Sequence, residues 1–176
     1  MLKLITKITA AVAVVSIALF GSANAKTLKI ETHFTASSPN GEVAAQFAKN
    51  VEKFSGGSLK VQMFYSSSVT GKSAEVFNSA QTGIIDCDMT GAGYQTGKNA
   101  AFQFAGDVMG GYDNPYQQYE FLNFPGAQEA VDALYNKYGM TLIGWWIPGH
   151  ESLISSRPIP DVASLKDFKF LSLIHI

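Results

Sequence analysis

The sequence predicts an α/β fold built around a mostly parallel sheet. Segments with alternating apolar residues and β-branched side chains recur along the chain, and segments of helical periodicity separate them. Glycines mark several of the boundaries between the two kinds of segment. A helix between two strands returns the chain to the same end of the sheet, so the strands run parallel. We therefore expect one sheet with helices on its faces.

Residues 1–25 have the three parts of a secretory signal peptide. Lys3 and Lys7 give a basic start, Ile8–Phe20 is an uninterrupted apolar run, and the triplet "ANA" ends at Ala25. A membrane anchor is the alternative, but the apolar run is shorter than the about 20 residues that span a bilayer. We expect cleavage after Ala25 and export of the remaining chain.

The chain after Ala25 has the length of one ordinary domain and alternates strand-like with helix-like segments. Val43, Phe47 and Phe54 recur at helical spacing, and Gly56 ends that helix. The predicted strands are residues 27–34, 58–65, 84–91, 140–147 and 151–156, and the predicted helices are residues 41–57, 71–83, 114–124 and 126–138. A long region rich in glycine and aromatic residues lies between the third strand and the later helices.

Composition argues against several classes of function. Removing Lys3 and Lys7 from the 13 basic residues leaves 11 against 14 acidic ones, without a basic stripe, so nucleic acid is not an expected partner. Cys87 is the only cysteine, which excludes an intrachain disulfide and a CxxC metal site. It lies in the predicted strand of residues 84–91, where a small buried side chain is the simpler interpretation. We expect neither a cofactor nor a metal ion.

The chain carries none of the common enzyme motifs. We find no G-x-S-x-G elbow, no H-E-x-x-H and no phosphate-binding P-loop. His150 and Glu151 are adjacent, and a strand would send their side chains to opposite faces. A secreted enzyme that uses His150 and Glu151 on a small molecule is the alternative to a binding protein. A structural or adhesive secreted domain is a third possibility.

Candidate binding residues follow the predicted strands, because parallel α/β sheets bind ligands beyond the carboxyl ends of their strands. His33 and Phe34 follow the first strand, and the loop "TGAGYQTGK" follows the third. The predicted ligand contacts are Phe34, Tyr94, Trp146, His150 and Glu151. We expect the first four of them around one groove. Each aromatic ring could serve packing instead. Two consecutive tryptophans on a strand face opposite ways, so we expect one of Trp145 and Trp146 in the core.

The ordered series of segments resembles the N-terminal lobe of the DctP-type solute-binding proteins of tripartite ATP-independent periplasmic (TRAP) transporters. The matching stretches are "SGGSLKV", "TGKSAEVFNSAQTGIID", "GWWIPGHESLISSRPI" and "VASLKDFKF". The resemblance implies a binding protein, not an enzyme, with two lobes that close on a small organic anion, such as a carboxylate or a 2-oxo acid. It also implies docking on the membrane subunits of a TRAP transporter. Residues 26–150 would form the N-terminal α/β lobe, and residues 151–170 the crossing strand and the start of the second lobe.

The sequence departs from the family pattern at its C-terminal end. The pattern places an arginine at the position of Leu171, where its planar fork would clamp the ligand carboxylate. Arg157, the only arginine, matches a surface position instead. Residues 171–176, "LSLIHI", match the translation of a transposon-end adapter, so we expect a non-native tail and a truncated second lobe. A natural truncation is the alternative. A single lobe leaves a ligand open to water, and we expect this chain alone to bind carboxylates no more tightly than about millimolar.

Overall fold

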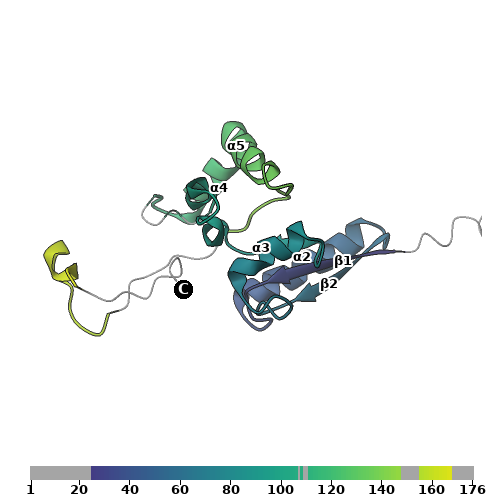
Figure 1. The fold of residues 1–176 in the computed structure, drawn as a ribbon, viewed down its shortest axis with the longest axis horizontal. Coiled ribbons are helices and arrows are strands. Elements are labelled where there is room, and N and C mark those ends of the chain that lie inside the picture. The colour runs from purple at the N-terminus through teal and green to yellow at the C-terminus, as the bar shows by residue number, and fades with distance from the viewer. Residues whose placement is uncertain (1–24, 107, 109–110, 148–154, 168–176) are drawn as a thin grey trace, which may run out of the picture.

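The structure is a computed structural model that describes residues 25–106, 108, 111–147 and 155–167 (Figure 1). Its strands and α-helices are β1 (Lys26–Thr32), α2 (Pro39–Phe54), β2 (Leu59–Phe64), α3 (Val76–Gln81), β3 (Cys87–Met89), α4 (Pro115–Asn123) and α5 (Pro125–Asn136). Short 3-10 helices are η1 (Ser73–Glu75), η2 (Ala92–Gln95), η3 (Ala100–Phe104) and η4 (Val162–Leu165). In Figure 1, α4 and α5 gather beside the sheet and its helices.

The three strands form one parallel sheet in the order β2-β1-β3. The central strand β1 pairs Glu31 with Phe64 on one side and with Asp88 on the other. Because α2 links β1 to β2 and α3 precedes β3, the chain makes the strand–helix–strand units that the sequence predicts. The predicted α/β class with a parallel sheet is therefore confirmed.

Helix α2 begins with a side-chain cap and a close backbone contact. The Ser38 hydroxyl accepts a hydrogen bond from the Gly41 amide at 3.1 Å, and Pro39 fills the first turn, where its missing N–H costs nothing. A Cβ atom added at Gly41 would lie 2.0 Å from the backbone oxygen of Thr35. The glycine therefore lets the loop after β1 lie directly against the first turn of α2.

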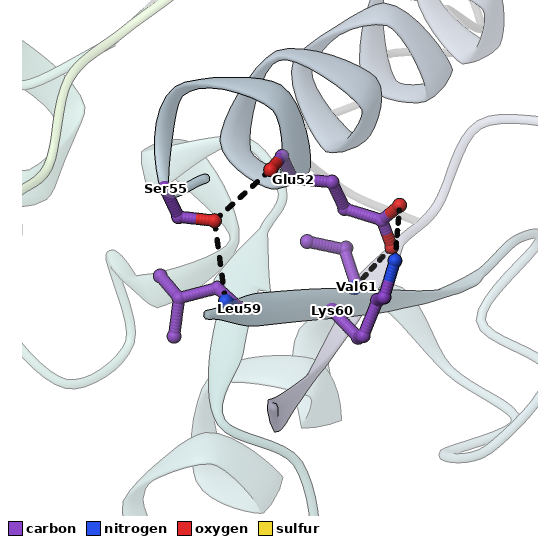
Figure 2. Close-up of polar contacts among 5 residues, drawn as sticks. All are labelled: Glu52, Ser55, Leu59, Lys60 and Val61. Carbon is purple, nitrogen blue, oxygen red and sulfur yellow. Dashed lines mark hydrogen bonds and ion pairs between the residues drawn. The ribbon is translucent and has the colours of Figure 1, made fainter. Parts of the chain in front are cut away.

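The end of α2 covers the outer edge of β2, as Figure 2 shows. Glu52 Oε1 accepts a hydrogen bond from the Val61 amide at 2.9 Å, and the Ser55 hydroxyl accepts one from the Leu59 amide at 3.2 Å. The second carboxylate oxygen of Glu52 lies 3.6 Å from Lys60 Nζ. Exposed edge amides invite pairing with another chain, so these two side chains protect the edge strand.

The hydrophobic core joins α3 to α5 through the segment that follows β3. Its buried members are Phe77, Ala92, Phe102, Ala105, Val131 and Leu134. The Phe77 and Phe102 rings meet edge to face with centroids 5.8 Å apart, and the Phe102 ring lies 5.2 Å from that of Tyr135. Ring pairs of this geometry add to the free energy of burial. The core thereby holds η2 and η3 against the two helices.

The predicted fourth strand, residues 140–147, is wrong: the segment has no regular secondary structure. Its apolar residues pack against the core from outside the sheet, and they include Met140, Leu142 and Trp145. The Leu142 amide donates to Asp132 Oδ1 of α5 at 3.1 Å instead of to a neighbouring strand. The apolar residues of this segment are thus buried against the core, without a ladder of backbone hydrogen bonds to a neighbouring strand.

Other predicted segments lie partly or wholly outside the described residues. They are the signal peptide apart from Ala25, residues 151–154 of the predicted fifth strand, and residues 171–176. Residues 155 and 156, the end of that predicted strand, are not in a strand. Among the described helices, none is both long and apolar enough to cross a membrane. The predicted domain boundaries stay predictions.

The close contact at Gly41 makes a stability prediction. We expect Gly41→Ala to lower the free energy of unfolding by about 3 kcal/mol, because the new methyl group meets a backbone oxygen that cannot rotate away. Gly97→Ala is the matched control, since a Cβ atom there meets nothing within 4 Å. Urea unfolding of both variants measures the difference. Equal stability of the two variants would contradict the close approach of the loop to α2.

Candidate functional site

Parallel pairing places the carboxyl ends of β1 and β3 at the same edge of the sheet. His33 and Phe34 follow β1, and Tyr94 lies in η2, which follows β3. The His33 ring centroid is 3.9 Å from that of Phe34 and 5.5 Å from that of Tyr94. Trp146 arrives from the segment after α5 and lies 5.6 Å from Phe34. We call these four residues, each partly buried, the aromatic cluster.

The loop after β2 braces the end of β1 that carries the cluster. The Ser66 amide donates to the Phe34 carbonyl at 2.9 Å, and the Ser67 amide donates to the Thr32 carbonyl at 3.1 Å. Both serines adopt left-handed φ angles, 57° and 50°, which are uncommon for residues other than glycine. Hydrogen bonds to the strand end hold this strained turn in place. The backbone that presents Phe34 is therefore fixed from two sides, by β1 and by this loop.

His33 supplies the polar atom of the cluster. Its Nδ1 atom is buried and has no hydrogen-bond partner among the described residues. Burial lowers the pKa of the imidazole below its usual value of 6.5, so the ring is neutral at neutral pH. A neutral imidazole carries one donor and one acceptor nitrogen. An unpaired buried nitrogen costs stability, and a bound molecule that offers a hydrogen bond would satisfy it.

The structure brings together three of the five predicted contacts, Phe34, Tyr94 and Trp146. Phe34 and Tyr94 both lie against the His33 ring, and Trp146 lies against Phe34. Trp145 packs against the core and Trp146 joins the cluster, although the strand on which the expected division of the tryptophans was based is absent. That the three residues contact a ligand stays a prediction.

The other two predicted contacts, His150 and Glu151, lie outside the described residues. His33 was recognised in the sequence as following the first strand but was not among the predicted contacts. Its position next to Phe34 in the sequence could have indicated that His33 is a candidate contact as well. The lack of a partner for its buried Nδ1 could not be read from the sequence, because it depends on how Tyr94 and Phe34 enclose the ring.

The side chains of the aromatic cluster can make van der Waals contacts and hydrogen bonds with a ligand. Within the described ranges, no group of three or more histidine, cysteine or acidic side chains is placed to hold a metal ion. Flat rings pack against the carbon skeleton of a small molecule, and a few polar atoms fix its orientation. The arrangement suits a small, partly polar organic molecule.

Residues 30–172 match the family described as bacterial extracellular solute-binding protein, family 7, also called DctP. Comparison with curated protein sequences found no match. Several solved structures are similar. One is a TRAP periplasmic solute-binding protein from Rhodobacter sphaeroides in an apo open structure, with a TM-score of 0.62 and 25% sequence identity. The alignment covers 67% of this chain and 37% of that chain.

Two further structures were determined with bound molecules. A TRAP solute-binding protein from Pseudoalteromonas atlantica holds sodium and pyruvate, with a TM-score of 0.60, 20% identity and coverage of 66% of this chain and 35% of that chain. The receptor DctP6 from Bordetella pertussis binds pyroglutamic acid. Its TM-score is 0.56 at 21% identity, and the alignment covers 67% of this chain and 38% of that chain. The chain thus spans little more than a third of the length of these relatives. Because the family match extends over most of the sequence, the chain belongs to the DctP family of TRAP periplasmic solute-binding proteins.

Proposed function

We propose that the chain binds a small organic anion, a carboxylate or a 2-oxo acid, at the aromatic cluster. One observation carries this proposal: the rings of Phe34 and Tyr94 lie against a neutral histidine whose buried Nδ1 has no partner among the described residues, and Trp146 extends the cluster from Phe34. The cluster lies at the carboxyl ends of parallel strands, where α/β proteins bind their ligands. The small carboxylates that relatives hold, pyruvate and pyroglutamic acid, support the same class of ligand.

The rings and the histidine have different roles in this proposal. Phe34, Tyr94 and Trp146 contact the carbon skeleton, which excludes water from one side of the ligand. His33 is neutral, so it exchanges a hydrogen bond with an uncharged oxygen of the ligand and forms no ion pair with the carboxylate. His150 and Glu151 remain proposed contacts. The substituent next to the carboxylate is therefore the part of the ligand that His33 distinguishes.

The wider role follows from the family. We propose that the protein works in the periplasm after its signal peptide is removed, and that it delivers its ligand to the membrane subunits of a TRAP transporter. The family consists of binding proteins, so the chain is not an enzyme. The alternative of a secreted enzyme that uses His150 and Glu151 is set aside on this ground.

Tryptophan fluorescence tests the location of the ligand. The chain has two tryptophans, and only Trp146 belongs to the cluster. In Trp145→Phe, where Trp146 is the remaining reporter, we expect added pyruvate to change the emission in a saturable way, because the ligand displaces water from that ring. In Trp146→Phe, Trp145 reports from the core and its emission should stay constant. A saturable change that persists in Trp146→Phe but is absent in Trp145→Phe would refute the proposed site.

Substitution of His33 tests which nitrogen is used. An asparagine side chain places its polar atoms near the position of Nδ1, whereas a glutamine reaches the position of Nε2. We expect His33→Gln to weaken pyruvate binding by about tenfold, the value of one lost hydrogen bond, and His33→Asn to retain most of it. Titration of both variants followed by NMR chemical shifts gives the two affinities. Propionate, which lacks the keto oxygen, is the control ligand and should bind both variants alike.

If the two variants bind pyruvate equally, Nδ1 is not the recognising atom. If the wild-type protein and both variants each bind pyruvate and propionate with equal affinity, His33 contributes only packing.

A further inference from the structure

Glu31, on β1, is a buried carboxylate that holds the loop after β2, residues 65–72. The residue is 0% exposed. Oε1 accepts hydrogen bonds from the backbone amides of Val69 at 2.6 Å and Thr70 at 3.4 Å. Oε2 is buried and has no hydrogen-bond partner among the described residues, so the bonds that the structure gives this carboxylate all go to the loop. A charged acceptor makes stronger hydrogen bonds than a neutral one, so Glu31 attaches this part of the loop firmly to β1.

The beginning of the same loop contacts the end of β1 that leads into the aromatic cluster. The Ser66 amide donates to the Phe34 carbonyl at 2.9 Å, and the Ser67 amide donates to the Thr32 carbonyl at 3.1 Å. Within the loop, the Gly71 amide donates to the Ser67 carbonyl at 2.6 Å, which joins this turn to the segment that the buried carboxylate holds. The loop is therefore attached at two places, by two backbone carbonyls and by one carboxylate.

The turn at Ser66 and Ser67 depends on these attachments. Their φ angles of 57° and 50° are uncommon for residues other than glycine and persist where surrounding contacts determine them. Ser67 is 5% exposed, and its hydroxyl oxygen lies 3.3 Å from that of Ser73, whereas Ser66 is exposed. Without the attachment at Glu31, we expect the turn to relax and its two amides to leave the carbonyls that they bind.

We propose that Glu31 is a positioning residue for the aromatic cluster. Its carboxylate keeps the loop after β2 folded against β1, and the amides of that loop fix the backbone that presents Phe34. In this proposal Glu31 raises ligand affinity through the loop and does not itself contact the ligand. The inference rests on the proposed function, because it assigns part of the affinity of the cluster to a residue outside it. Whether Glu31 holds the turn can be tested without a ligand.

Glu52 offers a matched comparison within the same sheet. Its Oε1 accepts a hydrogen bond from the Val61 amide at 2.9 Å, as Figure 2 shows. Both glutamates therefore bind a backbone amide of another segment. Val61 is the third residue of β2, before the loop begins, so Glu52 holds no part of the loop. Glu52→Ala removes a carboxylate–amide bond and leaves the turn at Ser66 and Ser67 in place.

The first experiment measures the backbone carbonyl carbon resonances of the full chain by NMR, without ligand. We expect Glu31→Ala to shift the resonances of Thr32 and Phe34, because these carbonyls lose the hydrogen bonds that the loop donates. Glu31→Gln keeps an oxygen acceptor of the same reach and should leave both resonances near their wild-type positions. Glu52→Ala should leave them unchanged.

The second experiment titrates the same proteins with pyruvate. We expect Glu31→Ala to bind about tenfold more weakly, the value of one lost hydrogen bond, and Glu31→Gln and Glu52→Ala to retain most of the affinity. Adding Ser66→Gly to Glu31→Ala should recover part of the loss, because glycine adopts a left-handed φ without strain. A role of Glu31 in stability alone would not make pyruvate affinity depend on the residue at position 66.

A third measurement needs no variant of the buried residue. Coupling between two sites is reciprocal, so a ligand that the held loop favours must also hold the loop. With pyruvate at about ninefold its dissociation constant, hydrogen exchange of the Val69 amide in the wild-type chain should slow by up to about tenfold. The Val61 amide, which Glu52 holds, is the internal control and should slow less.

Three results would overturn the positioning role. They are wild-type pyruvate affinity in Glu31→Ala, an equal loss of affinity in Glu52→Ala, and a Val69 exchange rate that saturating pyruvate leaves unchanged. If the wild-type chain does not bind pyruvate, the proposed function is refuted instead. The carbonyl resonances of the ligand-free variants then still decide whether Glu31 holds the turn.

Discussion

The pairing of β1 with a parallel neighbour on each side is the constraint on which the rest of the structure depends. Parallel pairing brings the carboxyl ends of β1, β2 and β3 to one edge of the sheet. Three loops leave this edge. The loop after β1 carries His33 and Phe34, the loop after β2 contains the turn at Ser66 and Ser67, and the segment after β3 carries Tyr94. No residue of the aromatic cluster lies within a strand, yet three of its four members owe their positions to strand register.

Two buried polar groups sit directly beneath this edge. Glu31 ties β1 to the loop after β2 through the amides of Val69 and Thr70, and it faces Asp88 across the β1–β3 pair. His33 follows Glu31 by two residues, and its Nδ1 has no hydrogen-bond partner among the residues that the structure describes. Proteins keep unpaired buried groups where function or a bound species accounts for them. The two buried side-chain atoms without a hydrogen-bond partner among the described residues, Glu31 Oε2 and His33 Nδ1, therefore belong to one region of the molecule.

Hydrophobic periodicity predicted the first three strands and the helices between and after them. Residues 140–147 were wrongly predicted as a strand, because Met140, Leu142 and Trp145 are apolar residues that pack on the core and do not pair in a sheet. Glu31 lies out of phase with the apolar Leu28 and Ile30 of "TLKIET", yet the structure buries it completely. Its burial depends on a loop almost forty residues later, which local periodicity cannot report. Phe34, Tyr94 and Trp146 could be named because strand ends and aromatic content are visible in the sequence.

In the proposed function, the aromatic cluster contacts the carbon skeleton of a small carboxylate. Intermolecular nuclear Overhauser effects between the methyl group of pyruvate and the protein test this contact most directly. We predict cross-peaks from the methyl protons to the rings of Phe34, Tyr94 and Trp146, and none to the exposed rings of Tyr116 and Phe124. Cross-peaks confined to those exposed rings, with none to the cluster, would contradict the account.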